Sequence, residues 1–98
     1  MARRTKTWMV GAVRRMLHQV GVTDLEPVYV EADDCSVDDS IDLCKAGVPT
    51  TLSLQIGHGY FGANRYEYDT DGQLDSCWTL YMGEDFHEAA RKLVAAAA

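Results

Sequence analysis

The stretch NRYEYDTDGQLDSCWTLYM, residues 64–82, decides the fold, because it has the pattern of two strands joined by a turn. Aromatic and charged residues alternate over 64–69, and apolar residues recur over 74–82, as in strands with one buried face. Thr70-Asp71-Gly72 between them has the composition of a hairpin turn. We therefore expect a β-hairpin as part of an antiparallel sheet.

The register of this hairpin follows from its apolar side chains. The two tyrosines of the first strand must share a face with the apolar residues of the second. A three-residue loop with Gly72 in the left-handed conformation satisfies this requirement, and a two-residue loop does not. This register sets Glu67 opposite Asp75, a pair of like charges that is unfavourable unless it is solvated or bridged.

The rest of the chain predicts two further strands and three helices. In residues 5–20 an apolar arc lies opposite a basic arc, which predicts a helix that Gly21 ends. Ser36 as an N-cap, acids in the next turn and apolar residues at helical spacing predict a short acidic helix that ends near Gly47. The other expected elements are strands at 27–31 and 51–56 and a helix at 84–95.

The order α-β-α-β-β-β-α indicates a small α+β domain, in which helices pack on one face of an antiparallel sheet of three to four strands. A chain of 98 residues with 47% hydrophobic content is long enough for one modest core. We expect a single domain over 1–98, frayed at 1–4 and 96–98.

The cysteines and the hydropathy favour a cytoplasmic protein. Three cysteines without a C-x-x-C pair, Cys35, Cys44 and Cys77, argue against a disulfide framework. No run approaches the roughly 20 apolar residues of a membrane span. Arginines also interrupt the N-terminal segment, unlike the apolar core of a secretory signal. We therefore expect no membrane association.

Charge is distributed unevenly along the chain, whose net charge is −6. Residues 1–20 hold five basic side chains and no acid, whereas residues 21–98 hold four basic side chains and all fifteen acids. Eight of these acids lie between Asp24 and Asp42, without a Lys or Arg among them. Such a segment projects a negative potential that attracts a protein partner with a basic surface. The predicted partner-binding residues are Glu31, Asp33, Asp34, Asp38, Asp39 and Asp42.

The basic N-terminal helix offers an alternative, in which cationic side chains lie along phosphates and an indole stacks on a base. The residues of this alternative nucleic-acid site are Arg3, Arg4, Trp8, Arg14 and Arg15. A sequence pI near 4.8 weighs against nucleic acid as the main partner. The same helix could instead neutralise the acidic segment, within one molecule or across a homodimer.

Two motifs suggest ligands that other features oppose. Residues 57–62, GHGYFG, match the G-x-G-x-x-G dinucleotide fingerprint, but a strand pattern follows where that site needs a helix. The hairpin acids resemble part of a calcium loop, but its twelfth position, a glutamate in such loops, is Trp78. These weak metal candidates are Glu67, Asp69, Asp71 and Asp75. The histidines and cysteines show no zinc-ligand spacing, so we expect neither cofactor nor metal.

We therefore expect a non-catalytic acidic interaction or inhibitor module that docks on a basic partner surface, which could itself bind nucleic acid. Small acidic proteins that block nucleases or host-defence complexes, phage proteins among them, act in this way, which is an analogy at the level of the class. One alternative is a nucleic-acid-associated protein that uses the N-terminal helix. A second is a small nucleotide- or metal-binding protein that uses the loop at 57–62 or the hairpin at 67–75.

Overall fold

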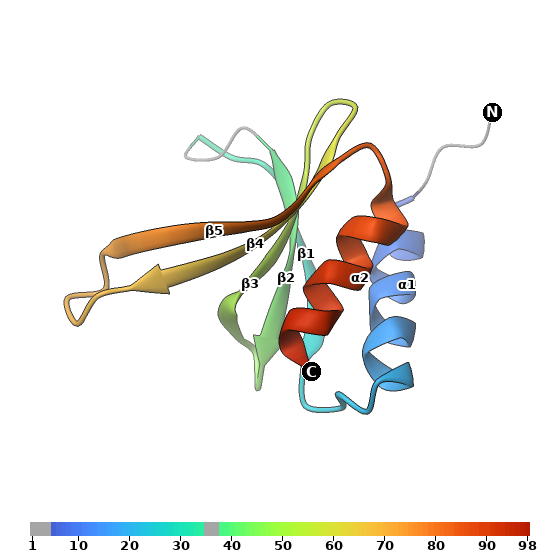
Figure 1. Ribbon diagram of the computed structural model, residues 1–98, viewed down its shortest axis with the longest axis horizontal. Coiled ribbons are helices and arrows are strands. Elements are labelled where there is room, and N and C mark those ends of the chain that lie inside the picture. Colours follow the sequence, from blue (N-terminus) through green and yellow to red (C-terminus); the bar gives the residue numbers. More distant parts are fainter. Residues whose placement is uncertain (1–4, 35–37) are drawn as a thin grey trace.

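The computed structural model describes residues 5–34 and 38–98, which form a five-stranded antiparallel sheet and two helices. The strands lie in the sheet in chain order: β1 (Glu26–Val30), β2 (Asp39–Lys45), β3 (Val48–Ile56), β4 (Phe61–Tyr68) and β5 (Leu74–Gly83). The helices α1 (Lys6–Gln19) and α2 (Phe86–Ala97) lie side by side on one face of this sheet (Figure 1). The α+β class and the antiparallel sheet are confirmed, but the sheet has five strands instead of the predicted three to four, and the order is α-β-β-β-β-β-α.

The short acidic helix predicted after Ser36 is wrong where the structure describes it, because residues 39–45 form strand β2. The start of that predicted helix, at residues 36 and 37, lies outside the described residues. Ile41 and Leu43 are both fully buried, which is the period of two that a strand requires. Ala46 and Gly47 have positive φ, 51° and 81°, as the two central residues of a tight hairpin turn do. The apparent helix stop is therefore the turn between β2 and β3.

Both helices begin at side chains that cap them. Thr5 Oγ1 accepts a hydrogen bond from the Trp8 backbone N–H at 3.1 Å, and Asp85 Oδ1 accepts one from the His87 backbone N–H at 2.9 Å. Each cap satisfies an N–H that has no partner inside its helix. The end of α2 is Ala97, two residues beyond the predicted end at 95.

The β4–β5 hairpin has the predicted loop but a different pairing. Gly72 is left-handed, with φ 79°, and a backbone hydrogen bond of 2.8 Å closes the three-residue loop. Glu67 faces Ser76, and not Asp75, because a β-bulge places one extra residue in β5 at this point. The predicted pair of like charges is therefore wrong.

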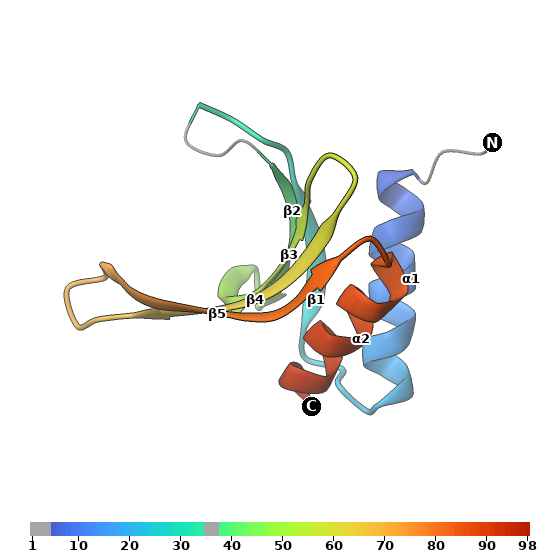
Figure 2. The same cartoon turned by 45° about the horizontal axis from the view of Figure 1, so that its top comes forward.

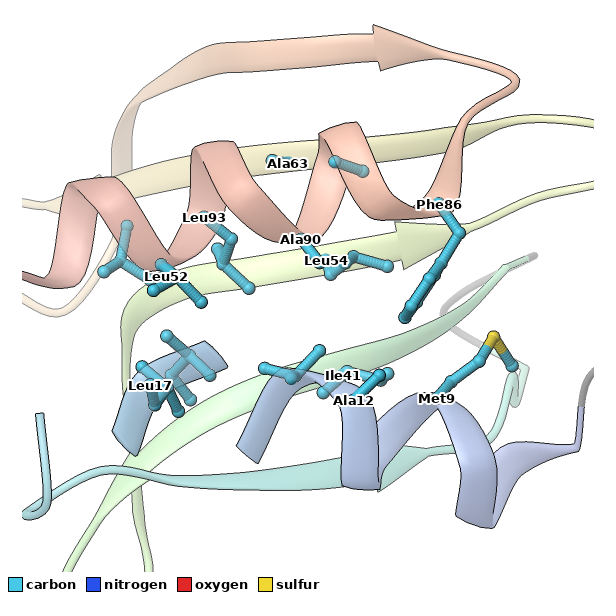
Figure 3. Packing of buried hydrophobic residues seen from close by; sticks show 14 residues of the cluster. Met9, Ala12, Leu17, Ile41, Leu52, Leu54, Ala63, Phe86, Ala90 and Leu93 are labelled. Carbon is cyan, nitrogen blue, oxygen red and sulfur yellow. The ribbon is translucent and has the colours of Figure 1, made fainter. Parts of the chain in front are cut away.

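The core lies between the two helices and the sheet face that they cover (Figure 3). Its largest fully buried side chains are Val13, Leu17, Ile41, Leu43, Leu54, Phe86 and Leu93. Removal of these apolar surfaces from water is the main force that holds the helices on the sheet. The sheet is strongly bent, and the β4–β5 hairpin projects away from the helices (Figure 2). The opposite face of the sheet carries no helix in the part of the chain that the structure describes.

Candidate functional site

A polar pocket of about 260 Å³ lies on the sheet face that the helices leave uncovered. Its walls come from three neighbouring strands, β2, β3 and β4. The side chains that matter for its chemistry are Asp38, Ser40, Asp42, Ser53, Gln55 and Tyr66. The pocket therefore combines carboxylates, hydroxyl groups, an amide and an aromatic ring.

The antiparallel register brings these side chains together. Asp42 pairs with Ser53, and Ser40 pairs with Gln55, so all four side chains share one face of adjacent strands. The residues that alternate with them, such as Ile41, lie in the core on the other face. One alternating pattern thus builds both the core and the pocket.

Asp42 accepts hydrogen bonds from two serines, and these three side chains, Asp42, Ser40 and Ser53, form what we call the floor of the pocket. Ser53 Oγ donates a hydrogen bond to Asp42 Oδ1 at 2.7 Å, and Ser40 Oγ donates to the same oxygen at 3.2 Å. Ser53 is only 9% exposed, so its hydroxyl is positioned by the sheet itself. Within residues 5–34 and 38–98, Asp42 Oδ2 receives no hydrogen bond. This oxygen remains available to a ligand.

Asp38 lies at the end of a second group of hydrogen bonds. Tyr60 Oη and Gln55 Nε2 both donate to Asp38 Oδ2, the amide at 2.6 Å. These two hydrogen bonds, Tyr60 first, lower the pKa of the Asp38 carboxyl below its ordinary value. Behind them Asn64, only 4% exposed, donates to Gln55 Oε1 at 3.4 Å. Asp38 is therefore an anion at neutral pH.

Tyr66 and Tyr68 of β4 give the pocket an aromatic side. Burial is the main cause of a raised pKa at the Tyr66 phenol, which therefore stays neutral at physiological pH. Pro49, the second residue of β3, also lines the pocket. The walls thus offer apolar surface above a polar, anionic floor.

The glycine loop at 57–62 positions Tyr60. A Cβ atom at Gly57 would lie 2.0 Å from Tyr60 Cε1, so only glycine leaves room for the ring in its present position. Strand β4 begins at Phe61, earlier than the predicted start at 64, so Gly62 lies in a strand where the dinucleotide fingerprint needs the start of a helix. The loop places Tyr60 where its hydroxyl donates to Asp38, and it leads into a strand and not into the helix N-terminus that binds a phosphate.

The predicted acidic residues divide into two groups. Asp38, Asp39 and Asp42 line the pocket, whereas the structure places Glu31, Asp33 and Asp34 elsewhere. Asp39 accepts hydrogen bonds from the hydroxyl of Tyr29 at 2.6 Å and from the Ala32 backbone N–H at 2.7 Å. These bonds, Tyr29 first, lower the pKa of Asp39.

Sequence reasoning missed the neutral members of the pocket, Ser40, Ser53, Gln55 and Tyr66, and it also missed Tyr60. A signal was present for two of them. Ser53 and Gln55 are the polar positions of the alternating segment 51–56, so they had to share one face. The side chains that lie next to them depend on β2, whose secondary structure was mispredicted.

The basic helix is partly neutralised within the molecule, as one of the alternatives held. Arg14 pairs with Glu26, its Nε donating at 2.7 Å, and Lys6 pairs with Glu31. Trp8 packs its ring against Phe86, with 5.6 Å between ring centroids. Two more residues of the nucleic-acid alternative, Arg3 and Arg4, lie outside the described residues. Arg15 is exposed on α1.

Of the hairpin acids, Asp69 has a structural role at the turn. Asp69 Oδ1 accepts hydrogen bonds from the backbone N–H groups of Asp71 and Gln73, both at 2.9 Å. Among the residues that the structure describes, no three His, Cys, Asp or Glu side chains are grouped as a metal site. Cys44 is buried and Cys77 is exposed, and Cys35 lies outside the described ranges.

In the described part of the chain, neither helix has the length and apolar character needed to cross a membrane. Comparison of the chain with protein-family models, with curated proteins and with solved structures found no match.

Proposed function

We propose that this protein is a non-catalytic interaction or inhibitor module that docks the uncovered face of its sheet on a basic surface of a partner protein. The observation that carries the proposal is the pocket of about 260 Å³, where Asp38, Asp39 and Asp42 lie among neutral polar groups. Among the residues that the structure describes, no Lys or Arg lines it. A basic group is the complement that such a surface attracts.

The placement of the cations supports this proposal. Lys45 pairs with Asp24 at 3.4 Å, and Arg65 donates to the Ala96 carbonyl at 3.3 Å on the helix side of the sheet. The cations of α1 lie on the same helix side, and Lys6 and Arg14 pair there with acids. In residues 5–34 and 38–98, these cations therefore lie away from the pocket, which favours rapid, salt-sensitive association with a basic partner.

The direction of the pKa shifts at Asp38 and Asp39 supports binding over acid–base catalysis. A general acid or base at neutral pH needs a carboxyl whose pKa is raised towards 7. The hydrogen bonds of Asp38 and Asp39 lower their pKa values instead. The nucleic-acid alternative gains no comparable support, because Arg14 and Trp8 are engaged with Glu26 and Phe86.

The test uses a short peptide rich in Arg and Lys as the basic probe, with a peptide of Asp and Glu as its opposite. We expect the wild-type protein to bind the basic peptide in calorimetry at about 10 mM salt and more weakly at about 150 mM, because the screening length falls from about 30 to 8 Å. The double variant Asp38→Asn/Asp42→Asn should bind about tenfold more weakly at low salt, as the loss of two exposed ion pairs implies.

The matched control is Asp33→Asn/Asp34→Asn, which removes the same charge from the same acidic segment but outside the pocket. It should keep most of the affinity. Equal losses in both double variants would show that binding depends on overall charge and not on the uncovered face. The absence of wild-type binding to the basic peptide would overturn the proposal altogether.

A further inference from the structure

The pocket has the size of a single side chain. Its volume of about 260 Å³ lies below the roughly 300–1,000 Å³ of pockets that hold drug-sized ligands. A nucleotide or an oligosaccharide would therefore extend far beyond it. The end of one long side chain from a partner protein is a better match in size.

The hydrogen bonds of the floor select the chemistry of that side chain. Ser40 and Ser53 each have one hydroxyl proton, and both protons are directed to Asp42 Oδ1. Their remaining capacity is as acceptors, and Asp42 Oδ2 is a further acceptor without a donor among the described residues. The floor thus presents only acceptors, which oppose a carboxylate or phosphate and favour a group that carries donors alone. Among side chains, Lys and Arg are the cationic groups of this kind.

The walls favour Arg over Lys. Tyr66, Tyr68 and Pro49 line the pocket with apolar and aromatic surface. A guanidinium is planar, weakly hydrated and able to stack on an aromatic ring, whereas an ammonium is strongly hydrated and carries fewer donors. A guanidinium can also donate to several acceptors at once, as the spread of oxygens over β2 and β3 requires.

We infer that the pocket accepts one arginine side chain of the basic partner, with the guanidinium on the floor formed by Asp42, Ser40 and Ser53. This inference rests on the proposed function and makes it more specific. Asp38 and Asp39 add further negative charge to the lining, and the aliphatic stem of the arginine would lie along the tyrosine side of the pocket.

The test is an NMR titration of the full chain with three blocked amino acids: N-acetyl-arginine amide, N-acetyl-lysine amide and N-acetyl-citrulline amide. Citrulline is the neutral counterpart of arginine in nearly the same shape. We expect millimolar binding of arginine, with shifts at the amides of Asp42, Ser53 and Tyr66. The Kd for lysine should be about threefold higher, because its compact, strongly hydrated ammonium cannot stack on an aromatic ring as the planar guanidinium does. Citrulline should cause no saturable shift.

Two variants locate the effect. Asp42→Asn keeps the shape of the side chain and should weaken arginine binding at least fivefold. Asp71→Asn removes an exposed acid at the hairpin tip, outside the pocket, and should leave the Kd within a factor of two. Tyr66→Leu should reduce the preference for arginine over lysine, because it removes an aromatic ring from the lining.

The outcomes separate this inference from the proposed function. If the basic peptide binds through Asp38 and Asp42 but arginine does not perturb the pocket, the single-arginine inference is wrong and the docking proposal stands. Equal binding of lysine, or saturable binding of citrulline, would also overturn it. The wild-type titrations decide the matter even if a variant fails to fold. If neither the peptide nor arginine binds, both proposals fail.

Discussion

Replacement of Phe86 by alanine should remove the side chain that joins α1, α2 and the sheet. Phe86 is 0% exposed, and its ring centroid lies 5.6 Å from that of Trp8 in α1 and 5.5 Å from that of Phe61 in β4. The change therefore removes buried apolar surface and leaves a cavity among three elements. Phe86 lies on the opposite side of the sheet from the pocket, so the substitution tests the core alone.

The expected loss is about 4 kcal/mol in the free energy of unfolding, within the 3–5 kcal/mol found for truncation of a fully buried Phe. A domain of this size has roughly 5–15 kcal/mol in total, so the variant should be folded but only marginally stable. Phe86→Leu keeps most of the apolar volume and should lose only about 1–1.5 kcal/mol, because it removes chiefly the edge and face contacts between rings.

Urea unfolding followed by far-UV circular dichroism measures these losses, with the denaturant slope as a check that the unfolding remains two-state. A double-mutant cycle with Phe61→Leu isolates the contact between the two rings, which we expect to contribute about 0.5–1.5 kcal/mol. A loss below about 1.5 kcal/mol for Phe86→Ala would refute the reasoning, since removal of a fully buried ring should lower the free energy of unfolding by more than that. A coupling energy of zero would refute the ring contact alone.

Two other predictions concern charged groups. Tyr60→Phe should raise the pKa of Asp38 towards its ordinary value, because it removes the first cause of the lowered pKa. Since that pKa is lower in the folded protein, its stabilising effect is present above about pH 3.9 and is lost as the pH falls through the folded value. The variant should therefore lose less stability on acidification, and an unchanged Asp38 pKa in a carboxyl NMR titration would contradict this. Arg14→Ala/Arg15→Ala should change the free energy of unfolding by no more than about 0.5 kcal/mol, because the pair with Glu26 is exposed. A urea-unfolding loss above about 1.5 kcal/mol would show that this pair is structural.

The elements with a strong local pattern could be predicted from sequence. The apolar arc over 5–20 predicts α1, and the composition of 70–72 is sufficient for the loop in which Gly72 is left-handed. These signals are local, because helix periodicity, capping and turn conformation each depend on residues within a few positions of one another. The pairing beside that loop was less accessible, since the bulge at Asp75 arises from the fit of β5 to β4.

The pocket required the tertiary structure, and the reason is the segment 39–45. Its apolar residues fit both a short helix and a strand, and at this length the local pattern does not distinguish them. Pairing with β1 and β3 makes it a strand, which places Asp42 beside Ser53. The sequence alone determined that the acidic segment is negative and that Ser53 shares a face with Gln55. Only the pairing of β2 with β3 decided that these groups meet, because register is a property of two strands together.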